Sequence, residues 1–296
     1  MSAWDWLSDR QKERTRGLDI STERKSGARS VSRLVDLYLE TRKDKSGYNT
    51  TRNHLEKLRS EFGGLPIDDI SPLKARRWIE GIPLAPRTRW GIYSSCRSFA
   101  AWAGRYEFAA GNPFAVMEEP EKGEPPKVIL TVAQMKALLA AEMPVYMRSW
   151  IVLGGFAGIR TEELLRMTWN AVNLEEKEIH VSREAIKRTR GGMRERYVSM
   201  LPAVIRHSPQ GQSGKIIPVA RTTFHYHAKR IAKAVFNIED GWPHNCLRHS
   251  FASYHLAMWE DSGKTAHQMG HTSPNMVHQN YARAVKKKEA TEWWAL

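Results

Sequence analysis

Cysteine is scarce in this sequence, and long apolar runs are missing. The 296 residues include two cysteines, Cys96 and Cys246, which are far apart and form no disulfide framework. No apolar run approaches the roughly 20 residues that a transmembrane helix requires. The first residues, MSAWDWLSDRQKERTRG, lack the apolar core of a signal peptide. We therefore expect a soluble protein in a reducing, cytoplasmic setting, with no membrane partner.

Sequence motifs for nucleotide and metal binding are also missing. The chain has no glycine-rich loop of the Walker type, which would cradle nucleotide phosphates. Six of its eleven histidines lie between residues 244 and 278, but without a Cys/His or His-Glu-x-x-His zinc pattern. We therefore expect neither a metal site nor a nucleotide cofactor.

Positive charge, by contrast, is abundant. Lysine and arginine number 46 against 32 acidic residues, so the net charge is +14 and the pI is about 9.8. Basic charge of this size favours a polyanionic partner, because neutralising phosphates releases their counterions. An anionic lipid surface, or no specific partner at all, is the alternative. Nucleic acid is the favoured partner class.

The first half of the chain predicts a helical domain between polar segments. Residues 1–28 are charged and predict a flexible arm. Residues 29–116 repeat apolar positions at helical spacing, in the segments 31–42, 50–62, 71–82 and 86–105. These helices also carry basic residues, namely Lys74, Arg76, Arg77, Arg87, Arg89 and Arg97. Residues 117–127, MEEPEKGEPPK, predict a linker because they are rich in proline and glutamate.

Residues 128–296 predict a second domain that is mainly helical, with a small β-hairpin. Thr131 and Gln134 form a capping box before the first helix, and an apolar helix follows at 148–158. An amphipathic segment at 160–174 leads to strands at 177–182 and 195–201 around a basic turn. Further helices are expected at 222–236 and 248–259. The predicted fold class is α+β, with helix dominant.

Four islands in this second domain carry residues suited to chemistry. They are GFAGIRTEELLRMTW with Arg160, the basic hairpin REAIKRTRGGMRERYVSM with Lys187, WPHNCLRHSFASYHLA with His244 and Arg248, and QMGHTSPNMVHQNYARAV with His271 and Tyr281. Each has an ordinary reading when taken alone. The arginine and lysine can be surface residues, the histidine a turn residue, and the tyrosine a core residue.

Together and in this order, the islands resemble the tyrosine recombinase (phage integrase) family. AGIRTEELLRMTW is similar to the family's first arginine box, LRHSFAS to its second, and MGHTSPNMVHQNYARAV to its final box. The resemblance implies a helical core-DNA-binding (SAM-like) domain at 29–116 and a catalytic domain at 128–296. It implies the catalytic residues Arg160, Lys187, His244, Arg248, His271 and Tyr281, with Glu163 in support.

Two positions depart from the family pattern. The residue three before the second arginine is ordinarily histidine, but here it is Asn245, with His244 one residue earlier. Either His244 reaches the site through a shifted turn, or Asn245 fills the position. The interval from His271 to Tyr281 is also ten residues, where nine is commoner.

The implied function is site-specific breakage and rejoining of DNA through a 3′-phosphotyrosine, without metal or ATP. The implied partner is double-stranded DNA, on which the protein is expected to assemble as a homo-tetramer, with an accessory DNA-bending protein as an optional partner. The implied location is a bacterial or phage-like cytoplasm, in association with the nucleoid. The alternatives are a DNA-binding protein with weakened catalysis and a topoisomerase- or resolvase-like nicking and closing enzyme. Trp293 and Trp294 in the tail either dock on a neighbouring protomer or fold back on their own domain.

Overall fold

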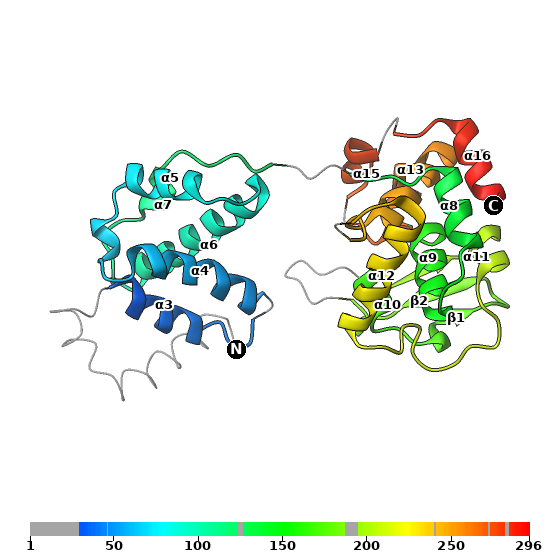
Figure 1. The fold of residues 1–296 in the computed structure, drawn as a ribbon, viewed down its shortest axis with the longest axis horizontal. Helices are drawn as coiled ribbons and strands as arrows, with labels where there is room; N and C mark the ends of the chain where they lie inside the picture. The colour runs from blue at the N-terminus through cyan, green and yellow to red at the C-terminus, as the bar shows by residue number, and fades with distance from the viewer. Residues whose placement is uncertain are drawn as a thin grey trace. The chain divides into compact units, whose positions relative to one another are not determined.

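The computed structural model describes residues 30–45, 47–123, 127–186, 195–239, 241–271, 273–281 and 284–296. The chain divides into two compact units, Met1–Pro125 and Pro126–Leu296, which Figure 1 colours from blue to green and from green to red. The predicted arm, at 1–28, and the predicted basic turn around residues 191–192 lie outside the described residues.

The first unit is helical. Its elements are α3 (Val31–Glu40), α4 (Tyr48–Phe62), a 3-10 turn (Ile67–Asp69), α5 (Pro72–Gly81), α6 (Pro86–Arg105) and α7 (Pro113–Val116). Two helix starts follow from capping chemistry, because the Ser30 and Ser71 side chains accept hydrogen bonds from backbone N–H groups of the first turn. The apolar faces of α3, α4 and α6 meet in one core, where Leu34, Leu55 and Phe99 are fully buried.

The start of the predicted linker packs on this first unit. Glu118 pairs with Arg76, and Trp90 Nε1 donates to Glu119 at 2.7 Å. The Lys122 ammonium lies 5.0 Å from the centroid of the Trp90 ring, a cation–π distance. Residues 118–122 are therefore attached to α5 and α6 rather than extended in solvent.

The second unit combines helices with a small antiparallel sheet of strand order β1-β2-β3. Its elements are α8 (Val132–Ala140), α9 (Val145–Phe156), α10 (Thr161–Leu164), a 3-10 turn (Trp169–Ala171), β1 (Val172–Asn173), β2 (Glu178–Val181), β3 (Arg196–Ser199), α11 (Pro202–His207), α12 (Arg221–Phe236), α13 (Cys246–Trp259), α14 (Ser262–Met269), α15 (Pro274–Tyr281) and α16 (Lys287–Ala295). Ile179 of β2 pairs with Val198 of β3, and both side chains are buried. The predicted class, mainly helix with a small sheet, is confirmed.

The segment at 160–174 differs from its prediction. Its periodicity suggests an amphipathic helix, but α10 ends after one turn at Leu164. A distant segment takes the backbone partners that would continue the helix: Trp169 N donates to Gly214 O at 2.9 Å, and Ile216 N donates to Met167 O at 3.1 Å. Because the partners come from residues 214–216, local periodicity does not reveal this ending.

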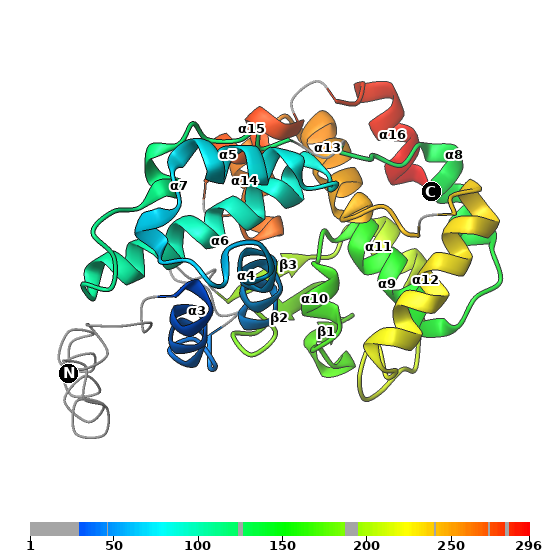
Figure 2. The same cartoon turned by 60° about the vertical axis from the view of Figure 1, so that its left-hand side comes forward.

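Helix α13 forms the centre of the second unit and is buried along most of its length. The tail helix α16 packs against it, as Figure 2 shows for the red and orange helices. Trp293 is fully buried and stacks on Tyr254 of α13, with ring centroids 4.1 Å apart. Trp294 Nε1 donates to Tyr254 O at 3.2 Å. In this chain the tail thus folds back on its own unit.

One buried histidine of α13 predicts acid-sensitive stability. His255 is fully buried, and its Nδ1 lies 2.7 Å from Thr265 Oγ1. Burial, followed by the charge of Lys264, lowers the pKa of His255 to about 4. An unfolded histidine has a pKa near 6.5, so between these values the unfolded chain binds more protons and stability falls as the pH falls.

We expect His255 to remove about 1–2 kcal/mol from the free energy of unfolding between pH 7 and pH 5. Urea denaturation across this range measures the effect. His255→Gln should make the pH dependence shallower, whereas the same change at exposed His267 should leave it as in the wild type. Equal slopes for the wild type and His255→Gln would contradict the prediction.

Candidate active site

Three arginines converge on the C-terminal end of α14. Arg196 Nε donates to Gln268 O at 3.1 Å, and Arg248 Nη2 donates to Met269 O at 2.5 Å. Arg160 donates from Nη1 to Met269 O at 3.2 Å and from Nη2 to Gly270 O at 3.3 Å. The last carbonyls of a helix lack partners within it and carry partial negative charge, so they suit guanidinium donors. The end of α14 therefore gathers three arginines from three other segments.

Gly270 makes this gathering possible. It takes the left-handed conformation that ends α14, with φ +63°. A Cβ atom at this position would lie 2.9 Å from Arg196 Nη1, so only glycine fits without displacement. In the turn that follows, the backbone N–H of His271 donates a hydrogen bond to Ala266 O at 2.8 Å. The Gly-His pair is thus a helix ending that holds the arginines and places the histidine beside them.

Glu163 orients two of the arginines. Its side chain is 1% exposed. Arg196 donates to both carboxylate oxygens, at 3.1 and 2.7 Å, and Arg160 donates from Nη1 at 3.1 Å and from its backbone N–H at 3.0 Å. Burial alone would raise the pKa of Glu163. The hydrogen bonds and charges of Arg196 and Arg160 lower this pKa by a larger amount, so the net shift is downward. The carboxylate is therefore ionised at neutral pH.

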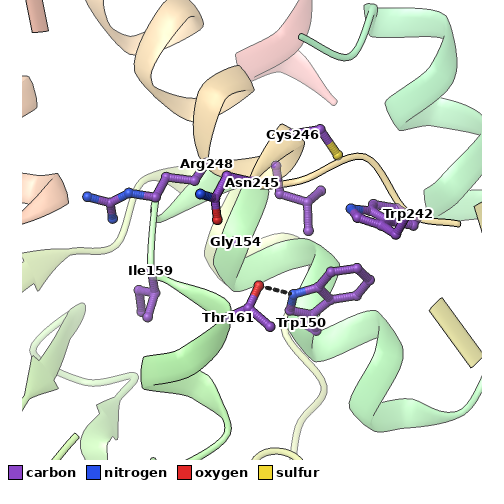
Figure 3. Close-up of a pocket in the computed structure, with 9 residues that line it drawn as sticks. Trp150, Gly154, Ile159, Thr161, Trp242, Asn245, Cys246 and Arg248 are labelled. Atoms are coloured by element: carbon purple, nitrogen blue, oxygen red, sulfur yellow. Dashed lines mark hydrogen bonds between the residues drawn. The ribbon is translucent and has the colours of Figure 1, made fainter. Parts of the chain in front are cut away.

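Arg248 is held by backbone carbonyls from two directions. It lies on the first turn of α13, and besides Met269 O it donates from Nη1 to Gly158 O. Figure 3 shows its guanidinium pointing away from the pocket that Trp150 and Trp242 line. Five N–H donors belong to each arginine, and these two bonds leave others of Arg248 available for an anion.

The Tyr281 hydroxyl lies against a histidine that the sequence motifs did not single out. Tyr281 ends α15 and is 6% exposed. Its Oη is 2.7 Å from Nδ1 of His249, the residue after Arg248 on α13. Burial raises the pKa of the Tyr281 phenol, and the charges of Arg248 and Arg160 act in the opposite direction. The two arginines are thus close enough to stabilise a phenolate electrostatically.

Positive charge dominates the site. Arg160, Arg196 and Arg248 outnumber the single carboxylate of Glu163. Burial, followed by the charges of these arginines, lowers the pKa of His271 to about 3, so its imidazole is neutral at pH 7. The His271 Nδ1 is buried and has no hydrogen-bond partner among the residues that the structure describes. Such a surplus of fixed donors and positive charge suits a bound anion such as a phosphodiester.

The structure brings four of the six predicted catalytic residues into one neighbourhood, namely Arg160, Arg248, His271 and Tyr281. His244 is exposed, and its Nε2 lies 3.4 Å from Asn245 Nδ2. Asn245 itself lines the pocket of Figure 3 with Trp150 and Thr161. Lys187 lies outside the described residues.

Sequence reasoning missed His249 and did not separate Arg196 from the other arginines of the hairpin. His249 stands next to Arg248 in LRHSFAS, so one residue of helix places it beside the second arginine. Arg196 lies two residues before buried Val198 on β3, so both side chains point to the same, inward face of the strand. That alternation was visible, but its partner Glu163 comes from another segment.

The residues that the structure describes offer neither a metal site nor a membrane span. No group of three or more His, Cys, Asp or Glu side chains there could hold a metal ion. No described helix is both long and apolar enough to cross a membrane.

Comparison with known proteins places the chain in a family. The sequence pattern of the "Phage integrase family" matches residues 129–288. A tyrosine recombinase XerD from Xanthomonas campestris pv. campestris is 27% identical over 290 residues, covering 88% of this chain and 89% of that protein. A second XerD, from Xanthomonas axonopodis pv. citri, is 28% identical over 252 residues, covering 76% and 82%.

Solved structures share the fold. The Tn1549 transposon integrase in complex with transposon right end DNA superposes with a TM-score of 0.68 at 20% identity, covering 86% of this chain and 96% of that one. A lambda integrase dimer bound to a COC′ core site gives 0.69 at 16% identity, covering 86% and 97%. The resemblance drawn from the four islands is therefore confirmed: the chain belongs to the phage integrase family and is a tyrosine-type site-specific recombinase.

Proposed function

We propose that this recombinase cleaves double-stranded DNA by attack of Tyr281 on a phosphodiester that Arg160 and Arg248 hold, leaving a 3′-phosphotyrosine. The observation that carries the proposal is the position of the Tyr281 hydroxyl, which is hydrogen-bonded at 2.7 Å to His249, the residue after Arg248, while Arg248 and Arg160 share the carbonyl of Met269. A covalent intermediate keeps the energy of the broken bond, so rejoining needs no ATP.

The remaining roles follow from where charge develops during the reaction. Negative charge gathers on the non-bridging oxygens, where rigid guanidinium donors act better than flexible ammonium groups. His271, neutral and with a buried Nδ1 free of partners among the described residues, suits donation to the same phosphate. Lys187 is assigned from the sequence alone to protonate the departing 5′ oxygen.

The proposed partners extend beyond the cleaved strand. The net charge of +14 supports double-stranded DNA as the substrate, and the solved relatives named above were bound to DNA. We place the reaction in a homo-tetramer on DNA, with an accessory DNA-bending protein as an optional partner, in a cytoplasmic, nucleoid-associated setting. In this scheme, the packing of α16 on its own unit is the arrangement of the chain before the tetramer assembles.

One observation favours a second function, a DNA-binding protein with weakened cleavage. The position three residues before Arg248 holds Asn245, which cannot exchange a proton as histidine can, and it lines a pocket with Trp150. Both functions predict salt-sensitive DNA binding, so only the covalent step separates them.

Covalent trapping tests the proposal. The wild-type protein is mixed with a pool of nicked duplexes of randomised sequence, and denaturant-resistant protein–DNA complexes are isolated. We expect an adduct whose nucleotide mass maps to the tryptic peptide 265–283, in which Tyr281 is the single tyrosine. Salt-sensitive binding without any adduct would favour the second function.

A follow-up on the trapped sequence separates recombination from simple nicking and closing. Two labelled duplexes that carry the site are incubated together, and the products are sized. Strands exchanged between duplexes support recombination, whereas rejoining confined to one duplex indicates a topoisomerase-like activity.

A further inference from the structure

We propose that His249 is the catalytic base that takes the proton of Tyr281 during cleavage and returns it during rejoining. This inference rests on the proposed role of Tyr281 as nucleophile. It assigns the proton transfer to the residue after the second arginine, rather than to His244 or Asn245.

The contact that supports this role is direct. His249 Nδ1 lies 2.7 Å from Tyr281 Oη, within the distance that proton transfer requires. The rings are 5.7 Å apart between centroids and inclined by 39°. The two sequence candidates, His244 and Asn245, are both exposed, and the described structure pairs their side chains with each other at 3.4 Å rather than with the Tyr281 hydroxyl.

Hydrogen bonds of the His249 backbone fix the helical position from which the imidazole projects. His249 N donates to Asn245 O at 2.8 Å in the first turn of α13, and Ser253 Oγ donates to His249 O at 2.9 Å. Arg248, one residue earlier, is anchored by two carbonyls. The helix therefore presents the phosphate-binding arginine and the base as neighbours with a fixed offset.

The protonation state suits a base. Titratable and charged groups from several segments face this imidazole: Lys127, His244, Arg248, His271 and Tyr281. Burial, followed by the positive charges among them, lowers the pKa of His249 to about 4, so it is neutral at pH 7 and can accept at Nδ1. A phosphate bound to the arginines brings negative charge that offsets these positive charges and raises the pKa toward the working pH.

The proton and bond changes balance within the site. As Tyr281 Oη bonds to phosphorus, its proton passes to His249 Nδ1, and the bond from phosphorus to the 5′ oxygen breaks. The 5′ oxygen takes a proton from Lys187 in the proposed scheme. In rejoining, the 5′ hydroxyl attacks phosphorus and returns its proton to Lys187, the phosphotyrosine bond breaks, and Oη recovers its proton from the imidazolium.

Two substitutions separate a base from a positioning group. His249→Ala removes both functions, whereas the amide of His249→Asn can place an acceptor near the position of Nδ1 but cannot carry the proton. His267→Ala, at an exposed histidine of α14, is the matched control. Rates of adduct formation are measured on the same pool of nicked, randomised duplexes from pH 6.5 to 9.5, with thermal melts for each variant.

We expect both His249 variants to form the adduct at least about a hundredfold more slowly at pH 7, with His267→Ala within about threefold of wild type. Their rates should rise nearly tenfold per pH unit, because only the rare phenolate then reacts. Wild-type rates from His249→Asn would make His249 a positioning residue and overturn the inference, as would near-wild-type rates from His249→Ala. If the wild type itself forms no adduct, the proposed function fails, which is a distinguishable result.

Discussion

Tyr281→Phe should abolish the covalent protein–DNA adduct while leaving DNA affinity within about threefold of wild type. The substitution removes one oxygen, the proposed nucleophile, and phenylalanine keeps the ring in its buried cluster with Phe251 and Val277. The lost hydrogen bond to His249 should cost about 0.5–1.5 kcal/mol of unfolding free energy, too little to unfold a domain of ordinary stability. Denaturing gels after trapping measure the adduct, and a gel-shift titration measures affinity.

Tyr254→Phe is the matched control for this substitution. The Tyr254 hydroxyl is also hydrogen-bonded, donating to Leu130 O at 2.9 Å, but it belongs to the core beneath the tail helix. We expect a similar loss of stability and an undiminished adduct. An adduct that persists in Tyr281→Phe would assign the nucleophile to another residue, and the mapped peptide would identify it.

Glu163→Gln should produce the largest loss of stability. The carboxylate is buried between Arg160 and Arg196, and Arg196 is itself 4% exposed. Removing one partner of a buried ion pair leaves an uncompensated charge and typically costs about 3–5 kcal/mol. For a unit of this size the thermal midpoint should fall by roughly 10 °C or more. Thermal and urea unfolding measure the change.

Glu162→Gln, at the next residue along the chain, is the control. Glu162 pairs with Arg221 and Arg166 near the surface, where such pairs contribute at most about 1 kcal/mol. Adduct formation should also fall in Glu163→Gln, because the amide keeps a single acceptor oxygen and Arg160 loses one of the two bonds that orient it. Equal effects of the two substitutions would mean that the buried cluster is not the structural centre of the site.

Local chemistry in the sequence determined most of the helices. The capping box of Thr131 with Gln134 is present as expected, because it depends on residues within one turn, and the serine caps at Ser30 and Ser71 are equally local. The order of the four islands also sufficed to name the family, since motif spacing is carried by the chain itself. These features need no knowledge of distant neighbours.

Tertiary structure alone decided the length of α10, the course of the tail and the partners within the site. Helix α10 stops early because residues 214–216 take its backbone partners, and Trp293 folds into its own unit because Tyr254 offers a stacking surface. His249 meets Tyr281 across 32 positions of sequence, a separation that no periodic pattern encodes. Contacts between distant segments form only when the chain is packed. The sequence by itself therefore identified Arg160, Arg248 and Tyr281, whereas the tertiary structure was needed to find His249 beside the tyrosine.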